Sequence, residues 1–138
     1  MSELVYKGLG FPVRLKNVKT REFRGEVLPD INHRKLEDLV FRSLLWLPAR
    51  FSGAHLIFIR GYMKLSQKDF ALALGMKSHA TISAWESKAS KATTMPLASE
   101  LVVRMLMADL LNDREFAIHF KEFLRLKATP SELKLKVA

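Results

Sequence analysis

Hydrophobic positions over residues 32–126 recur at the three- and four-residue spacing that is typical of amphipathic helices. The first run begins at a capping residue, Asp30 or Asn32, and ends before Pro48, a residue that cannot continue a helix. Pro96 is suited to a first helical turn and opens a long apolar run. After the first run, the pattern predicts helices over residues 54–63, 67–74, 79–88, 96–111 and 114–126.

Both ends of the chain show the two-residue period of half-buried strands instead. Residues 11–18 alternate apolar and polar side chains, and residues 26–31 give a second candidate that Pro29 restricts to an edge or a short piece. We therefore predict a small N-terminal hairpin or a pair of extended arms. The tail, residues 131–138, alternates Leu133, Leu135 and Val137, which predicts either a strand or a disordered end.

These patterns together predict a mainly α fold with five helices in the central domain. The expected organisation is an N-terminal hairpin or arm over residues 1–31, a helical domain over residues 32–111, and a C-terminal helix with its tail over residues 112–138. Within the helical domain, residues 66–88 form two short helices joined by a turn.

The first of these two helices has a clear beginning and end. Ser66 and Asp69 form a Ser-x-x-Asp box, in which the serine hydroxyl accepts a first-turn amide and fixes the start of the helix. Phe70 and the small Ala71 are predicted to face inward, where a following helix must cross closely. Gly75 supplies the left-handed conformation with which such helices end.

The second helix has one apolar side and one small polar side. Ser78 is the expected cap, and Ile82 and Trp85 are expected to pack against the first helix. His79 alone is more often an ordinary surface histidine, but a first-turn position on a major-groove helix favours a contact with DNA. The residues predicted to approach base edges are His79, Ala80, Thr81, Ser83 and Ala84.

At this point the chain resembles the phage-repressor or Xre family of helix-turn-helix domains. The resemblance rests on Ile59-Arg60, Leu65-Ser66-Gln67, Phe70-Ala71, Leu74-Gly75, Thr81-Ile82-Ser83 and Trp85-Glu86. It implies that Gln67 touches a DNA phosphate and that Arg60 forms an ion pair with Glu86. Lys77, Lys88 and Lys91 are also placed to hold the DNA backbone.

Three departures from the family pattern affect DNA reading more than the fold. The turn between Gly75 and Ser78 is one residue longer than the common pattern. Lys88 stands where the family usually has a glycine, at the second position after the Trp-Glu pair. Ala80 and Ala84 offer methyl groups where long polar side chains are common, so DNA shape is expected to carry part of the specificity.

The charge of the chain agrees with a polyanionic partner. Lysine and arginine number 23 against 14 acidic residues, for a net charge of +9. Residues 54–95, which include the helix pair, carry six basic and two acidic side chains. A generally basic protein surface is the alternative interpretation of the same balance.

The segments before the helix pair resemble bacterial antitoxins of the MqsA-like and HigA-like kinds. The similarity lies in Gly8-Leu9-Gly10-Phe11 and in the Gly25–Ile31 segment that leads to a helix. This resemblance implies a homodimer that represses its own operon and binds a cognate toxin. The chain has no cysteine, so the four-cysteine zinc module of MqsA is absent, and the N-terminal arm is the first choice for toxin binding.

Nothing in the sequence indicates catalysis, a metal or a cofactor. The four histidines fall on different predicted elements, and no phosphate loop or nucleophile-elbow motif occurs. The first residues lack the pattern of a signal peptide, and no apolar run is long enough for a membrane helix. A cytoplasmic location is therefore expected.

The sequence thus predicts a sequence-specific transcriptional repressor that binds double-stranded operator DNA as a homodimer, with the antitoxin of a type II toxin–antitoxin operon as its most specific form. Two alternatives remain. The helix-turn-helix could serve as the scaffold of a protein-interaction module, or the protein could be a phage-type regulator without a toxin partner.

Overall fold

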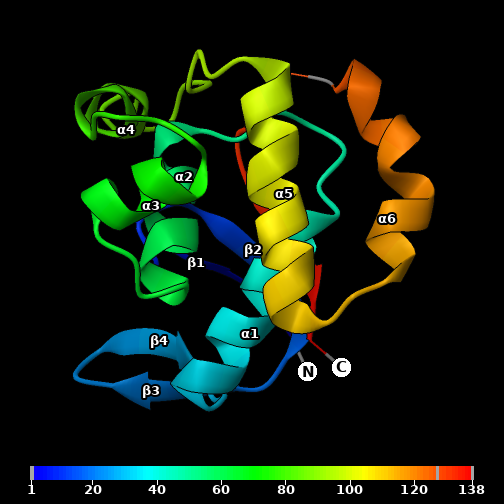
Figure 1. Cartoon of the computed structure of the whole chain (residues 1–138). Coiled ribbons are helices and arrows are strands. Elements are labelled where there is room, and N and C mark those ends of the chain that lie inside the picture. Colours follow the sequence, from blue (N-terminus) through cyan, green and yellow to red (C-terminus); the bar gives the residue numbers. More distant parts are fainter. Residues whose placement is uncertain (1, 127, 138) are drawn as a thin grey trace.

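The computed structural model describes residues 2–126 and 128–137 (Figure 1). Helices form most of the body, and short strands occur at both ends of the chain. In chain order the elements are β1 (Ser2–Tyr6), β2 (Val13–Val18), β3 (Thr20–Phe23), β4 (Glu26–Pro29), α1 (His33–Leu45), α2 (Gly53–Tyr62), α3 (Gln67–Ala73), α4 (Ala80–Glu86), α5 (Leu97–Leu111), α6 (Glu115–His119), the 3-10 helix η1 (Phe120–Arg125) and β5 (Leu133–Lys136).

The expectation of a mainly α fold with a short hairpin or arm is wrong. The described chain has six α-helices and is 47% helical, but a further 19% lies in strands that form two sheets, which makes the fold mixed α/β. The difference arises at the ends of the chain. Strand β1 and strand β5 lie far apart in sequence and both pair with β2, so local periodicity could not reveal that they belong to one sheet.

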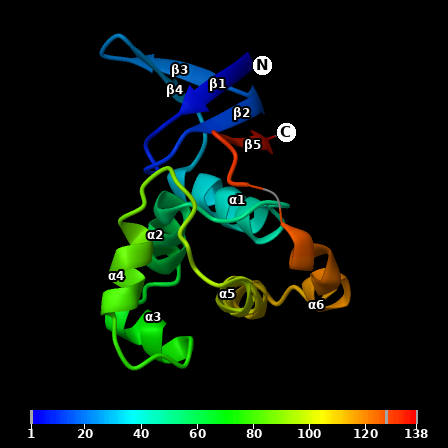
Figure 2. The same ribbon diagram turned by 90° about the horizontal axis from the view of Figure 1, so that it is seen from above.

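This three-stranded sheet covers one side of the helical body (Figure 2). Its order is β1-β2-β5, with β1 antiparallel and β5 parallel to β2. Val13, Leu15, Leu133 and Leu135 are buried on the inner face of the sheet, and β5 contacts α1. The alternation that the sequence shows in residues 11–18 and 133–137 thus reflects one buried and one exposed face.

Strands β3 and β4 form a separate antiparallel hairpin that projects from the body (Figure 2). The N-terminal hairpin was expected between residues 11–18 and residues 26–31, and this pairing is wrong. Residues 26–29 pair instead with Thr20–Phe23, a stretch whose four residues are all exposed and which the sequence pattern gives no reason to assign as a strand.

The helices follow the predicted order, with small shifts at their ends. Asn32 is the cap of α1, where its side chain accepts the N–H of Lys35 at 3.1 Å. The helix expected over residues 114–126 is divided into the short α6 and the tighter η1. Phe116 and Phe123, one from each piece, are both buried and pack at 4.9 Å between ring centroids.

One polar network lies in the core, where α5 meets the connection between α1 and α2. Arg104 is fully buried and donates to the carbonyl oxygens of Leu45 at 2.8 Å and Ala49 at 2.7 Å. Its guanidinium also lies over the ring of Phe51 at 4.2 Å. Burial lowers the pKa of Arg104 to about 10, so the side chain keeps its charge at neutral pH, beside the equally buried Glu100. The network fixes the long α5 against the loop that leads into α2.

None of the helices in the described residues is long and apolar enough to cross a membrane.

Candidate nucleic-acid interface

Helix α3 begins and ends as its sequence predicts. The hydroxyl of Ser66 accepts the N–H of Asp69 at 3.0 Å and caps the first turn. At the other end, the N–H of Met76 donates to the carbonyl of Ala71 at 2.8 Å, and that of Gly75 donates to Leu72 at 3.0 Å. With Gly75 at φ +74°, these two bonds form a Schellman motif, which turns the chain sharply toward α4.

Helix α4 is one short element on the outside of the molecule (Figure 1). Ile82 and Trp85 are buried, and the helix contacts both α2 and α3. The predicted cap is displaced by one residue: His79 holds the cap position without a side-chain bond, and Ser78 Oγ accepts the N–H of Ala80 at 3.1 Å. All five residues predicted to read bases are exposed, namely His79, Ala80, Thr81, Ser83 and Ala84.

An ion pair and an amide hold the end of α4. Arg60 on α2 reaches Glu86 with two hydrogen bonds, from Nε to Oε2 at 2.6 Å and from Nη2 to Oε1 at 3.1 Å. Its third nitrogen, Nη1, donates to the carbonyl of Leu65 at 3.0 Å. Gln67 Nε2 donates to Glu86 Oε1 at 2.9 Å. Glu86 is only 6% exposed, so these partners compensate a carboxylate that has left water.

The bond to Glu86 matters for the role predicted for Gln67. Its side-chain amide is half-buried and engaged with Glu86. In this structure Gln67 links the start of α3 to the end of α4.

The chain after α4 returns along the start of α2, so backbone hydrogen bonds to α2 hold this same C-terminal end of α4. The N–H of Gly53 donates to the carbonyl of Lys91 at 3.2 Å, and that of Ala54 donates to Ala89 at 2.9 Å. A Cβ atom on Gly53 would lie 2.6 Å from the carbonyl oxygen of Glu86, so only glycine permits this approach. Ala89 itself has a left-handed backbone, with φ +53°.

The surface around the two helices is positively charged. Lysines 64, 68, 77, 88 and 91 are all exposed, and this set includes the three predicted to hold the DNA backbone. Over residues 64–91 the acidic side chains are the exposed Asp69 and the paired Glu86. The excess of cations therefore favours a polyanion over an uncharged partner at this surface.

The structure thus brings together most of the predicted site. The exposed side of α4, the exposed lysines and the Arg60–Glu86 pair all lie on α2, α3, α4 and the segments that connect to them. Sequence reasoning missed the close backbone contact at Gly53, because a glycine after a serine cap indicates only the start of a helix. It also placed Gln67 outside the ion-pair network.

No protein-family model matches this chain, and no curated protein or solved structure is significantly similar to it.

Proposed function

We propose that this protein is a sequence-specific, double-stranded DNA-binding transcriptional regulator that inserts α4 into the major groove. The observation that carries this proposal is the exposed, small-residue side of α4, held on the unit formed by α2, α3 and α4, together with five exposed lysines over residues 64–91. A recognition helix needs its outer side free and its inner side fixed, and α4 has both properties.

The side chains on and beside α4 suit two kinds of DNA contact, with base edges and with phosphates. His79 and Ser83 can form hydrogen bonds with base edges, and the methyl groups of Ala80 and Ala84 suit the methyl group of thymine. Lys77 and Lys88 lie beyond the two ends of the helix, where cations meet the phosphate backbone. With so few long polar side chains on α4, the deformability of the DNA contributes to the choice of site.

The proposed active form is a homodimer on a palindromic operator. One short helix reads few base pairs, so two copies about 34 Å apart on the DNA are needed for useful affinity. Exposed apolar side chains of Ile118, Phe120 and Leu124 on α6 and η1, and of Phe23 and Val27 on the β3–β4 hairpin, offer two surfaces for the contact. Both surfaces lie outside the helix-turn-helix. The proposal also includes binding of a cognate toxin, which the resemblance of the flanking segments to antitoxins implies.

The decisive experiment is a selection of binding sites from random duplexes, followed by titration of the selected duplex at 150 mM salt. We expect the selected duplex to bind at least about 1,000-fold more tightly than random DNA. Binding with no enriched motif would contradict sequence-specific reading. The logarithm of affinity should fall with the logarithm of salt concentration at a slope near −0.9 for each phosphate contact, and a slope near zero would favour the protein-interaction module.

Two variants test the assigned roles. His79→Ala should relax the preference at one base position, with a loss of about 1–3 kcal/mol on the preferred site. Lys88→Ala should weaken all duplexes alike and leave the selected motif unchanged. If His79→Ala selects the same motif as the parent protein, another element reads the DNA.

A further inference from the structure

The outer face of the three-stranded sheet carries basic side chains in register. Arg14 lies opposite Lys134, and Lys16 lies opposite Lys136, across the parallel β2–β5 pair. We call these four residues the basic sheet face. Adjacent strands are about 4.8 Å apart, so like charges in directly opposite positions repel and destabilise the sheet.

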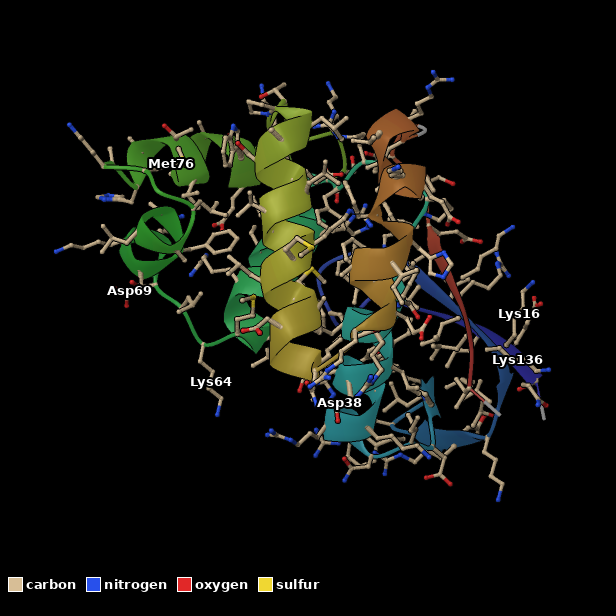
Figure 3. All side chains as sticks on the ribbon, turned by 45° about the vertical axis from the view of Figure 1, so that its right-hand side comes forward. Lys16, Asp38, Lys64, Asp69, Met76 and Lys136 are labelled. Carbon is tan, nitrogen blue, oxygen red and sulfur yellow. The ribbon has the colours of Figure 1, made fainter. Side chains whose placement is uncertain are left out.

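Only part of this repulsion is compensated within the chain. Arg14 donates to Glu132 at 2.6 Å and to Glu3 at 3.2 Å, and so links β2 to β1 on one side and to the residue before β5 on the other. Within residues 2–126 and 128–137, no carboxylate forms a salt bridge with any of the three lysines of this face, which are all exposed. Figure 3 shows Lys16 and Lys136 extending from the same side of the sheet.

Strand β5 also forms one edge of the sheet. The N–H of Leu133 donates to the carbonyl of Pro12, just before β2, and the N–H of Val137 donates to the carbonyl of Lys16 in β2. Because successive amides along a strand point to opposite edges, the N–H groups of Lys134 and Lys136 point away from β2. An edge with free amides can accept an additional strand.

We propose that the β5 edge and the basic sheet face bind an extended acidic segment of a partner protein, which adds as a fourth strand beside β5. Side chains on one face of an added strand repeat every 6.6–6.8 Å or so, as do Lys134 and Lys136. Acidic residues at alternate positions would therefore lie directly opposite these lysines. Each such pair stabilises the added strand, and the free amides of β5 supply its backbone hydrogen bonds.

Charge and position distinguish this partner from two others. A second copy of β5 at the same edge would place lysine against lysine. DNA on α4 lies elsewhere, because Lys16 and Lys136 are on the opposite side of the molecule from Met76 and Asp69 of the helix-turn-helix (Figure 3). The inference is therefore independent of DNA binding by α4.

The test uses the full chain and a labelled eight-residue peptide of alternating glutamate and valine. A peptide of the same composition, with four glutamates followed by four valines, has the same charge but cannot place its carboxylates on one face. We expect the alternating peptide to bind at least tenfold more tightly. We also expect it to slow hydrogen exchange at the amides of Lys134 and Lys136, which a purely electrostatic contact would not do. Equal binding of the two peptides, or tighter binding of a single-stranded oligonucleotide, would overturn the proposal.

Charge-reversal variants supply the matched control. Lys134→Glu/Lys136→Glu should weaken binding of the alternating peptide about tenfold or more. Arg114→Glu/Lys121→Glu changes the net charge equally at the start of α6 and on η1 and should leave binding unchanged. The single variant Lys136→Glu should also raise the thermal midpoint by one to a few degrees, since it replaces repulsion of Lys16 by attraction.

A different outcome would show that the lysines only protect the edge. In that case neither the parent protein nor Lys134→Glu/Lys136→Glu would bind either peptide. An unchanged or lower midpoint for Lys136→Glu would contradict the repulsion on which the proposal is built.

Discussion

Gly53 is the position at which a single methyl group should most directly disturb the packing of α4, the helix proposed to bind DNA. In Gly53→Ala the added Cβ would lie 2.6 Å from the oxygen of Glu86, 2.7 Å from the nitrogen of Ala89 and 2.9 Å from the oxygen of Trp85. All three are backbone atoms at the end of α4 and the turn after it. No side-chain rotation can relieve the contact, so α4 must move relative to α2.

The magnitude follows from this geometry. Ordinary contact begins near 3.4 Å, so the oxygen of Glu86 must retreat by roughly 0.8 Å. Forcing an extra carbon into a packed site typically costs about 1–3 kcal/mol. The greater helix propensity of alanine offsets roughly 0.5–1 kcal/mol of this. We therefore expect a net loss of about 1–2 kcal/mol.

Gly61 provides the matched control on the same helix. A Cβ there meets nothing within 4 Å, so Gly61→Ala should stabilise the protein by roughly 0.5–1 kcal/mol. The two variants make the same chemical change and should differ by about 2–3 kcal/mol. For 138 residues, the unfolding entropy of about 2.1 cal/mol/K per residue converts 1 kcal/mol to about 3 °C in thermal midpoint.

The assay is urea-induced unfolding of both variants, with DNA titration at a temperature at which each is fully folded. Gly53→Ala should lower the affinity for the selected duplex even where it is folded, because α4 is displaced. Gly61→Ala should bind as the parent does. If Gly53→Ala proves as stable as Gly61→Ala, the close backbone contact between α2 and α4 does not exist.

Three further changes test other parts of the structure by urea-induced unfolding. Arg60→Ala should lower the free energy of unfolding by about 2–4 kcal/mol because it leaves Glu86 buried with a neutral partner. Adding Glu86→Gln should restore part of the loss. An unchanged midpoint for Arg60→Ala would contradict this architecture. Arg104→Met should lose about 3–5 kcal/mol because three backbone carbonyls lose their donor, and a loss below about 1 kcal/mol would refute that role. Burial, with Arg104 nearby, lowers the pKa of His55 from 6.5 to about 4. As the pH falls, the unfolded chain therefore takes up a proton at His55 before the folded protein does. The stability that comes from neutral His55 is present above pH 6.5 and is lost as the pH falls toward 4. The loss between pH 7 and pH 5 should be about 2 kcal/mol, and His55→Gln should flatten the profile over this range.

The helical part of the fold could be predicted because its signals are local. Ser66, Asp69 and Gly75 fix α3 and its turn within ten residues, and those residues form the expected bonds. The Arg60–Glu86 pair could be anticipated only from the family resemblance, since nothing in the spacing of two charges 26 positions apart indicates contact.

The sheet could not be predicted for the opposite reason. Residues 13–18 and 133–136 each show a strand pattern, but their pairing and register depend on how the helices between them pack. Residues 20–23 are exposed on both faces and carry no alternation to recognise. Likewise, the role of Gln67 depends on a bond to Glu86 that only the folded arrangement of α3 and α4 creates.

The parallel pairing of β2 with β5 has a consequence for the order of events during synthesis. Arg14 and Glu132, which meet across this pair, are 118 positions apart, so at about 5–20 residues per second β2 emerges about 6–24 s before its partner. Helices α2, α3 and α4 contact one another over fewer than 40 residues and can dock long before that. These three helices can therefore pack together on the ribosome while one edge of β2, the strand that carries the buried Val13, Leu15 and Val18, is still unpaired.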